Sequence, residues 1–235
     1  MLLGFLHLFI PMLPHFSNPR MILPISIYEK RGIHLNIQTL FDPDNAVWSF
    51  LQKFYSLSLA GLLWFICSLP IITLGPATIA LYRYSFAVLD GCESYLFKSF
   101  FSVFAKSLRQ GIAVTLQLLL ATSFLIFDAW FFLNTIPILF FVAVALFLLV
   151  LFPGLHLFAL MSIKASTIKG FVSQAFYLSI RHLSTTVTLI VITCLWFLSI
   201  YALPISILFS AGPACILSAM FLRALYKRID VYKTI

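Results

Sequence analysis

Residues 111–133 read GIAVTLQLLLATSFLIFDAWFFL, and this stretch decides the class of fold. It contains a single ionisable residue, Asp128. Its length matches the ~20 apolar residues that an α-helix needs to cross the hydrocarbon core of a bilayer. Comparable apolar runs occupy residues 55–74, 136–163, 185–202 and 205–222. The sequence therefore predicts an all-α, polytopic transmembrane helical bundle.

Composition supports this class and excludes several others. Of the 235 residues, 62% are hydrophobic and only 9% are charged, against about a quarter charged in soluble domains. These values exclude disordered, collagen-like and ordinary soluble globular chains. The four cysteines (67, 92, 194 and 215) form no Cys-x-x-Cys pair and have no histidine at metal-ligand spacing, so neither a metal site nor a cofactor is predicted.

Known enzymatic motifs are absent from the chain. It contains no Gly-rich phosphate loop, no His-Glu-x-x-His and no Gly-x-Ser-x-Gly. We therefore predict no catalytic residues and expect the protein not to be an enzyme.

The first 40 residues differ from the rest. Residues 1–16 are apolar, but Pro11 and Pro14 interrupt them, no basic residue precedes them and no small-x-small cleavage pattern follows, so they do not make a good signal peptide. We interpret residues 1–40 as a loosely attached leader, or as an over-extended start with initiation at Met21. Residues 41–235 are predicted to form a single transmembrane domain.

Two segments are amphipathic rather than uniformly apolar. Residues 95–110 and 168–183 each place aromatic and aliphatic side chains on one face and Lys, Ser and Arg on the other, the pattern of a helix at the bilayer interface. A short amphipathic helix is also expected over residues 46–54. With residues 77–90 as a second span, the prediction is six membrane-spanning helices plus two interfacial ones. Those fourteen residues reach only ~21 Å against a core of ~30 Å, so five spans is the alternative.

The charge distribution predicts the topology. The net charge is +8, and basic residues concentrate in residues 83–109, 164–181 and 223–233, whereas the turns at Asn134 and Pro204 are uncharged. The positive-inside rule places the basic segments, and with them the C-terminus, in the cytoplasm. The N-terminus is then cytoplasmic with six spans and external with five. The basic residues are expected to face membrane lipids, and because they form no basic domain, no nucleic-acid partner is predicted.

Proline-containing turns recur in the chain. Pro70 removes one helical hydrogen bond, Gly75 allows either a close approach or a left-handed turn, and Pro76 is expected to be the first residue of the next helix. Residues 203–205 with 212–214 repeat the Leu-Pro-Ile and Gly-Pro-Ala pattern of residues 69–71 with 75–77. This similarity has two explanations, an internal duplication or chance likeness between Pro-containing turns.

The stretch around this motif resembles a known family. Residues 64–81 read WFICSLPIITLGPATIAL, with Phe-Asp-Pro-Asp upstream at residues 41–44 and Asp-Ala-Trp downstream at residues 128–130. This pattern is similar to the YesL-like family of bacterial integral membrane proteins, a domain of unknown function. Arg83 and the leader depart from the family pattern. The matching motif positions, predicted to be structural, are Trp64, Leu69, Pro70, Thr73, Gly75, Pro76 and Ala77.

The resemblance implies a location and a genetic context. It implies a multi-pass protein of the bacterial plasma membrane, encoded beside carbohydrate ABC-transporter genes, and it implies no known biochemical activity. The leading hypothesis is therefore an accessory or assembly component whose partners are ABC-transporter permease subunits; a homo-oligomer is also compatible with these features. The alternative is a small transporter with its site between Pro-broken helices.

Three ionisable residues inside apolar stretches are candidates for function, because such groups are costly in a bilayer. Arg83 and Asp128 have similar predicted depths, so we predict that they face one another as an ion pair. The alternatives are an interfacial Asp128 or a snorkelling Arg83. His156 follows the Pro153-Gly154 break and is expected to donate to carbonyls freed there; a proton relay is the other interpretation.

Overall fold

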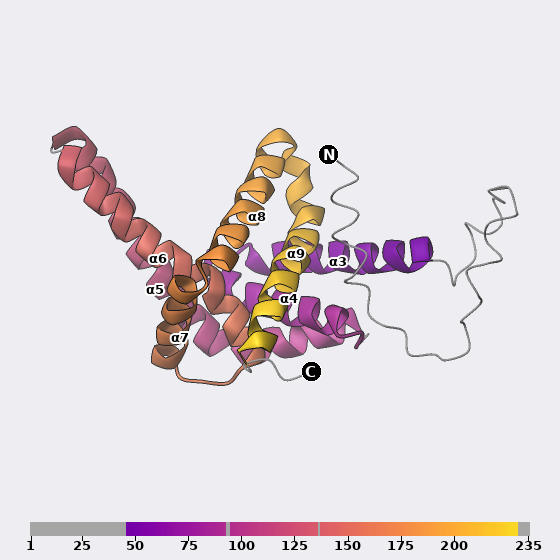
Figure 1. Cartoon of the computed structure of the whole chain (residues 1–235). Coiled ribbons are helices and arrows are strands. Elements are labelled where there is room, and N and C mark those ends of the chain that lie inside the picture. The colour runs from indigo at the N-terminus through magenta and orange to yellow at the C-terminus, as the bar shows by residue number, and fades with distance from the viewer. Residues whose placement is uncertain (1–45, 93–94, 136, 230–235) are drawn as a thin grey trace, which may run out of the picture. The chain divides into compact units, whose positions relative to one another are not determined.

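The computed structural model describes residues 46–92, 95–135 and 137–229 (Figure 1). Within these ranges the chain forms seven α-helices and two 3₁₀ turns, and no strand. The all-α prediction is therefore confirmed. The leader and residues 41–45 lie outside the described residues.

The first hairpin turns around a proline. Helix α3 (Ala46–Ser68) joins the predicted short helix to most of the first apolar run. It is followed by η3 (Ile71–Thr73) and α4 (Leu74–Leu89). The Thr73 hydroxyl lies 2.6 Å from the Cys67 carbonyl and 2.7 Å from the Pro70 carbonyl. Of the two, the Cys67 carbonyl lies in the last turn of α3, where carbonyls lack helical partners. Helix α4 begins two residues before Pro76, which lies in the first turn where its missing N–H costs nothing.

The second hairpin contains the two longest helices. Helix α5 (Leu96–Thr135) has 40 residues, so the expected separate interfacial helix over residues 95–110 is wrong: it is continuous with the following span. At ~1.5 Å per residue α5 is ~60 Å long, about twice the hydrocarbon thickness, so its Lys-bearing first part extends beyond a single crossing. Helix α6 (Pro137–Ile163) runs through Pro153 without a break.

The remaining elements are a short helix and a third hairpin. Helix α7 (Ile168–Arg181) is preceded by its N-cap, Thr167, whose side chain accepts the Gly170 N–H at 3.3 Å. It matches the second predicted amphipathic helix. Helix α8 (Leu183–Ala202), η4 (Pro204–Ser206) and α9 (Ile207–Arg228) follow.

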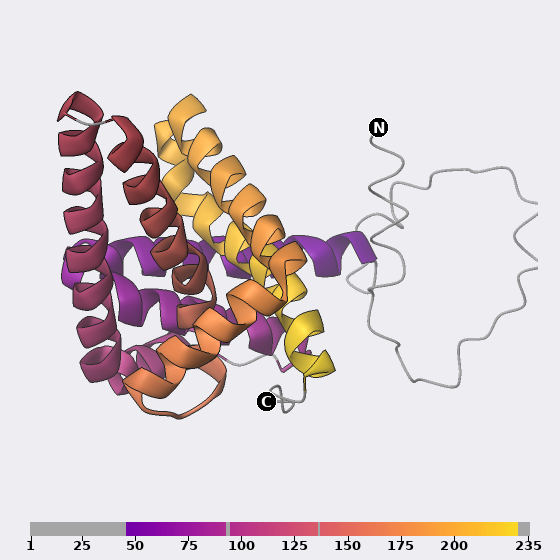
Figure 2. The ribbon, with the colours of Figure 1, turned by 60° about the vertical axis from the view of Figure 1, so that its left-hand side comes forward.

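Among the residues that the structure describes, five segments are long and apolar enough to cross a membrane: Ile71–Leu89, Leu96–Leu133, Ile138–Ile163, Leu183–Ala202 and Pro204–Arg228. The count of five equals the five-span alternative of the sequence analysis, but the segments differ. Helix α3 is not among the five, whereas residues 77–90 belong to one of them because residues 71–76 lengthen that segment. Figures 1 and 2 show α3 and α4 running across α8 and α9 rather than alongside them.

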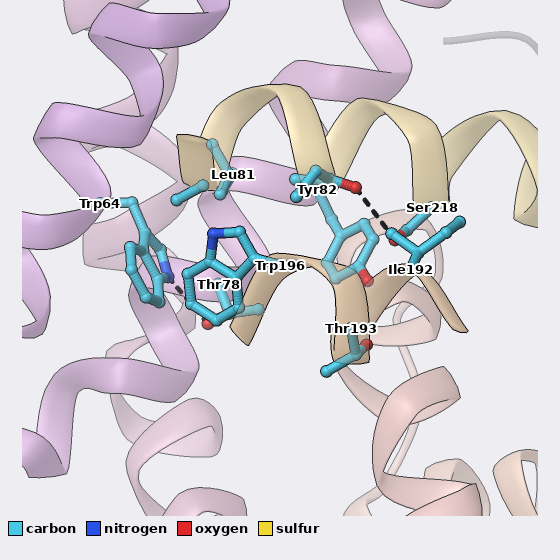
Figure 3. Close-up of a pocket in the computed structure, with 11 residues that line it drawn as sticks. Trp64, Thr78, Leu81, Tyr82, Ile192, Thr193, Trp196 and Ser218 are labelled. Atoms are coloured by element: carbon cyan, nitrogen blue, oxygen red, sulfur yellow. Dashed lines mark hydrogen bonds between the residues drawn. The ribbon is translucent and has the colours of Figure 1, made fainter. Parts of the chain in front are cut away.

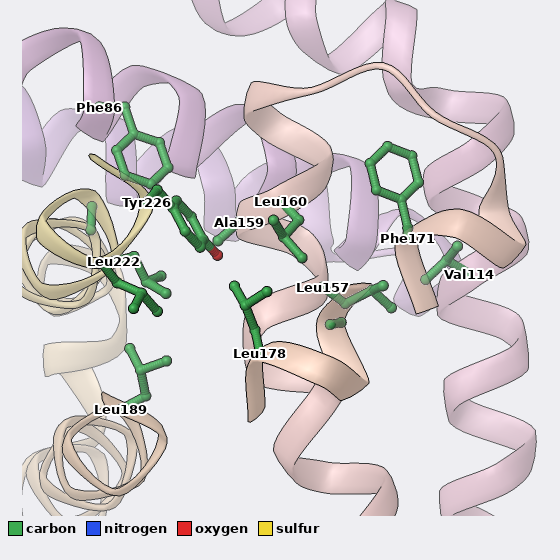
Figure 4. Close-up of a cluster of buried hydrophobic side chains, with 13 residues drawn as sticks. Phe86, Val114, Leu157, Ala159, Leu160, Phe171, Leu178, Leu189, Leu222 and Tyr226 are labelled. Carbon is green, nitrogen blue, oxygen red and sulfur yellow. The ribbon is translucent and has the colours of Figure 1, made fainter. Parts of the chain in front are cut away.

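A buried cluster joins six helices (Figure 4). Phe86 of α4 and Tyr226 of α9 lie with ring centroids 6.5 Å apart, and Leu157 and Leu160 of α6 and Leu189 of α8 extend the cluster. Val114 of α5 and the buried face of α7 complete it. This packing holds the six helices α4 to α9 against one another.

Two pairs of glycines mark the closest helix crossings. A Cβ atom on Gly212 of α9 would lie 1.8 Å from the Leu57 carbonyl oxygen of α3, and one on Gly61 would lie 2.7 Å from the Gly212 nitrogen. A Cβ atom on Gly75 of α4 would lie 2.7 Å from the Gly111 carbonyl oxygen of α5. Close backbone approach through small residues is typical of helix packing in membranes, so both Gly-Pro motifs act as packing points.

Candidate functional site

Two tryptophans meet where the first and third hairpins come together. Trp64 of α3 and Trp196 of α8 have ring centroids 5.9 Å apart and an interplanar angle of 75°, an edge-to-face contact. The Trp64 indole N–H donates to the Thr78 hydroxyl at 3.0 Å. The Trp196 indole N–H donates to the Ser210 hydroxyl, also at 3.0 Å. In each hairpin the acceptor lies 14 residues after the tryptophan, on the second helix.

A cavity of about 140 Å³ opens beside the two rings (Figure 3). Its lining is mainly apolar, with hydroxyl groups from Thr78, Tyr82, Thr193 and Ser218, and with no Asp, Glu, Lys, Arg or His among the lining residues. Typical small-molecule sites are about 300–1,000 Å³. This cavity therefore has room for a few waters or a small group. The Thr78, Thr193 and Ser218 hydroxyls already donate to carbonyls of their own helices, so they could bind such a group only as hydrogen-bond acceptors.

The Gly-Pro motif does not line this cavity but faces α5, where it has a packing role. Gly75 is buried, and its Cβ would meet the Thr115 hydroxyl at 1.9 Å. The one positive-φ glycine that the described residues contain is Gly91, so Gly75 serves close approach and not a left-handed turn. Pro76 contacts Gly111 and Ala77 is fully buried, whereas Leu69 and Pro70 are exposed at the turn.

Arg83 does not pair with Asp128. Its Nη1 instead donates to the Ser162 carbonyl at 3.3 Å, in the last turn of α6, where carbonyls lack helical partners and cations are favoured. The ion-pair prediction is wrong because α4 meets α5 at Gly111 and Thr115. Asp128 lies thirteen residues further along α5, ~20 Å away at 1.5 Å per residue.

His156 connects two helices instead of capping a break. It is fully buried, and its Nε2 lies 3.0 Å from the Thr186 hydroxyl of α8. That hydroxyl also lies 3.1 Å from the Ser179 carbonyl and 3.3 Å from the His182 carbonyl. Because a hydroxyl has one proton and both carbonyls only accept, Thr186 donates to a carbonyl and accepts from Nε2–H. The expected donation to carbonyls near Pro153 is therefore not the bond observed.

The structure also contains an ion pair that sequence reasoning missed. Arg223 of α9 pairs with Asp90, the residue that ends α4, and the Asp90 side chain is 1% exposed. Asp90 reads in the sequence as a helix breaker, and Arg223 as the start of a basic tail. The sequence signal that could have suggested this pair was a similar predicted depth in the membrane, since both residues lie at the ends of apolar segments.

Comparison with known proteins identifies one matching segment. Residues 57–129 match the sequence model of a family described as "Protein of unknown function, DUF624". The segment covers α3 from Leu57, all of α4 and most of α5, and so includes Trp64, the Gly-Pro motif and the Gly111 crossing. No curated protein and no solved structure matches the chain.

Proposed function

We propose that this protein is a YesL-like, non-enzymatic accessory or assembly component of a carbohydrate ABC-transporter system in the bacterial plasma membrane. One observation carries the proposal: the α5–α6 hairpin offers its apolar surface outward. Only 6% of the most apolar part of α6 is buried within the protein, against 11% of that of α5 and 11% of that of α8, and α5 and α6 are the two that are joined in one hairpin. A hairpin with so little internal packing has a large surface available to the helices of another membrane protein.

The family comparison supports the same proposal. The DUF624 match is to a family of unknown function, and the resemblance of residues 64–81 to YesL-like proteins likewise implies no assigned chemistry. The genetic context that the resemblance implies makes the permease subunits of a carbohydrate ABC transporter the expected partner.

Site-specific photocrosslinking tests this partnership. A photoreactive phenylalanine analogue would replace Phe124 of α5 or Phe141 of α6, which are 66% and 70% exposed. The same analogue at Tyr201, 88% exposed at the end of α8, provides the matched control. In native membranes we expect adducts with a permease subunit from the two hairpin positions and not from position 201. Lipid adducts alone at all three positions would contradict the proposal.

A small permease is the second candidate, favoured by the cavity between the two Pro-containing hairpins. Its volume of about 140 Å³ argues against a sugar-sized site in this conformation. Uptake into proteoliposomes containing only this protein would decide. Carbohydrate uptake that Ala214→Leu abolishes, by filling the cavity, would favour the permease, and no uptake favours the accessory role.

A further inference from the structure

A second and larger cavity lies at the opposite end of the third hairpin from η4. Its volume is about 550 Å³. It forms where α6 ends, α7 passes to α8, and α9 ends, and its lining is Leu160, Lys164, Gln174, Tyr177, Leu178, Arg181, His182, Arg228 and Ile229.

The charge of this cavity has one sign. Lys164, Arg181 and Arg228 contribute three cations, and His182 adds an imidazole, while the described lining residues include no carboxylate. All three cationic residues are exposed, so their head groups are reachable. The Arg181 guanidinium bonds the Tyr177 hydroxyl and lies 5.4 Å from the centre of that ring, which holds it in place. Arginine in a fixed orientation suits bidentate binding of phosphate oxygens.

The position of the cavity indicates a lipid-bound rather than a soluble anion. Lys164 follows the last residue of one candidate span, and Arg228 is the last residue of another, so both lie where hydrocarbon gives way to headgroups. Helix α7 beside them has an exposed apolar stripe formed by Val172, Phe176 and Ile180. An exposed apolar stripe on a helix that also carries basic residues is typical of a helix at the bilayer surface.

We propose that this basic cavity binds the headgroup phosphate of an anionic phospholipid, with Lys164, Arg181 and Arg228 as its ligands. Basic pockets between membrane helices bind anionic headgroups in this manner. The apolar stripe of α7 would lie along the acyl chains while the phosphate enters the cavity. The inference is independent of the transporter partnership, because it concerns a different surface.

Native mass spectrometry of the full chain, released from bilayers of equimolar phosphatidylglycerol and phosphatidylcholine, tests the proposal. We expect wild-type protein to retain phosphatidylglycerol preferentially. Each lost cation should weaken that preference by about fivefold, the equivalent of ~1 kcal/mol per basic residue at an anionic surface. The triple variant Lys164→Gln/Arg181→Gln/Arg228→Gln should lose most of the preference.

The control variant removes the same charge elsewhere. Lys98, Lys106 and Arg109 of α5 are exposed and do not line the cavity, so Lys98→Gln/Lys106→Gln/Arg109→Gln should keep the preference. Equal losses in both triple variants would overturn the site in favour of general attraction. Displacement of phosphatidylglycerol by inorganic phosphate would overturn the assignment to lipid. Arg228→Gln alone, at the exposed end of α9, provides a variant that retains its fold, and an unchanged preference there and in Arg181→Gln would also contradict the proposal.

Discussion

Glycine residues at the helix crossings of this protein determine how closely two helices can approach. Gly75 shows this clearly, since its neighbours are the Thr115 hydroxyl and the Gly111 backbone of α5. Leu69 and Pro70 of the same motif are exposed and belong to the turn between α3 and α4. The motif therefore ends one helix and provides a packing contact for the next.

Substituting Gly75 tests the packing contact. In Gly75→Val, side-chain atoms would overlap atoms of α5, and forced overpacking costs roughly 1–3 kcal/mol or more. We expect a lower yield of monodisperse protein and a lower midpoint of thermal unfolding, measured by size-exclusion chromatography of a fluorescent fusion.

The matched control is Gly154→Ala in α6. A Cβ atom there would meet only Leu118, at 4.0 Å, so folding should be unaffected or slightly improved because alanine favours helix. Normal yield of Gly75→Val would show that α4 and α5 can separate without cost.

The buried carboxylate of Asp90 makes a second prediction. Asp90→Asn leaves Arg223 facing a neutral group, and breaking a buried pair from one side costs about 3–5 kcal/mol. Because the Arg223 side chain is 26% exposed, the lower end of that range is expected, seen as a loss of thermal stability.

Asp128→Asn is the control for this charge change. Asp128 is half-buried and has no ion pair with a described residue, so the change in unfolding free energy should stay within about 0.5 kcal/mol. Equal destabilisation by the two variants would mean that the Asp90–Arg223 pair adds little to the fold.

At the scale of elements, the first and third hairpins share one design. In both, a proline follows the first helix, a 3₁₀ turn reverses the chain, and a tryptophan donates to a hydroxyl 14 residues later. Leu69 precedes Gly75 by six residues, whereas Leu203 precedes Gly212 by nine. The glycine at the helix crossing therefore lies about one helical turn further from the proline turn in the third hairpin than in the first. The tryptophan-to-hydroxyl bond is common to both hairpins, whereas the glycine spacing and the helix that each glycine faces differ, so duplication and chance likeness both stay open.

The bond between α6 and α8 yields a third prediction. Thr186→Val removes the acceptor for the buried His156 N–H, and leaving such a donor unpaired costs about 1–3 kcal/mol. Thr188→Val is the control, because Thr188 is half-buried and its hydroxyl bonds only its own helix at the Ser184 carbonyl, 2.9 Å away. Thermal unfolding would be measured for Thr186→Val, Thr188→Val, His156→Leu and the double variant His156→Leu/Thr186→Val. A double variant whose loss of stability equals the sum of the His156→Leu and Thr186→Val losses would show that the two side chains are uncoupled.

At the scale of the whole molecule, the predicted orientation in the membrane is testable by labelling. In a background with the four native cysteines replaced by serine, a membrane-impermeant maleimide should label Leu203→Cys in intact cells and spare Thr167→Cys. Both positions are exposed, and permeabilised cells should show labelling of both. The physical reason is the retention of basic loops on the cytoplasmic side. The reverse pattern would place the basic cavity on the external face.

Much of this architecture could be predicted because hydropathy acts locally. The apolar runs indicated the helices, and their ends follow local chemistry at Pro70, Pro204 and Thr167. The sequence therefore determined the all-α class and the amphipathic α7, because each depends on residues within a turn or two. For Gly75 it left a close approach and a left-handed turn open, and the contact with α5 decided for the close approach.

Only the tertiary structure decided which distant groups meet. The partner of Arg83 is a carbonyl of α6 rather than Asp128, and the partner of Asp90 is Arg223. Two residues at equal depth in a bilayer need not meet, because depth does not fix how each helix is rotated about its axis or where two helices cross. Helix α4 crosses α5 at Gly111, far from Asp128. The Trp64–Trp196 contact and the basic cavity arise in the same way, because each needs helices that are distant in the sequence to pack against one another.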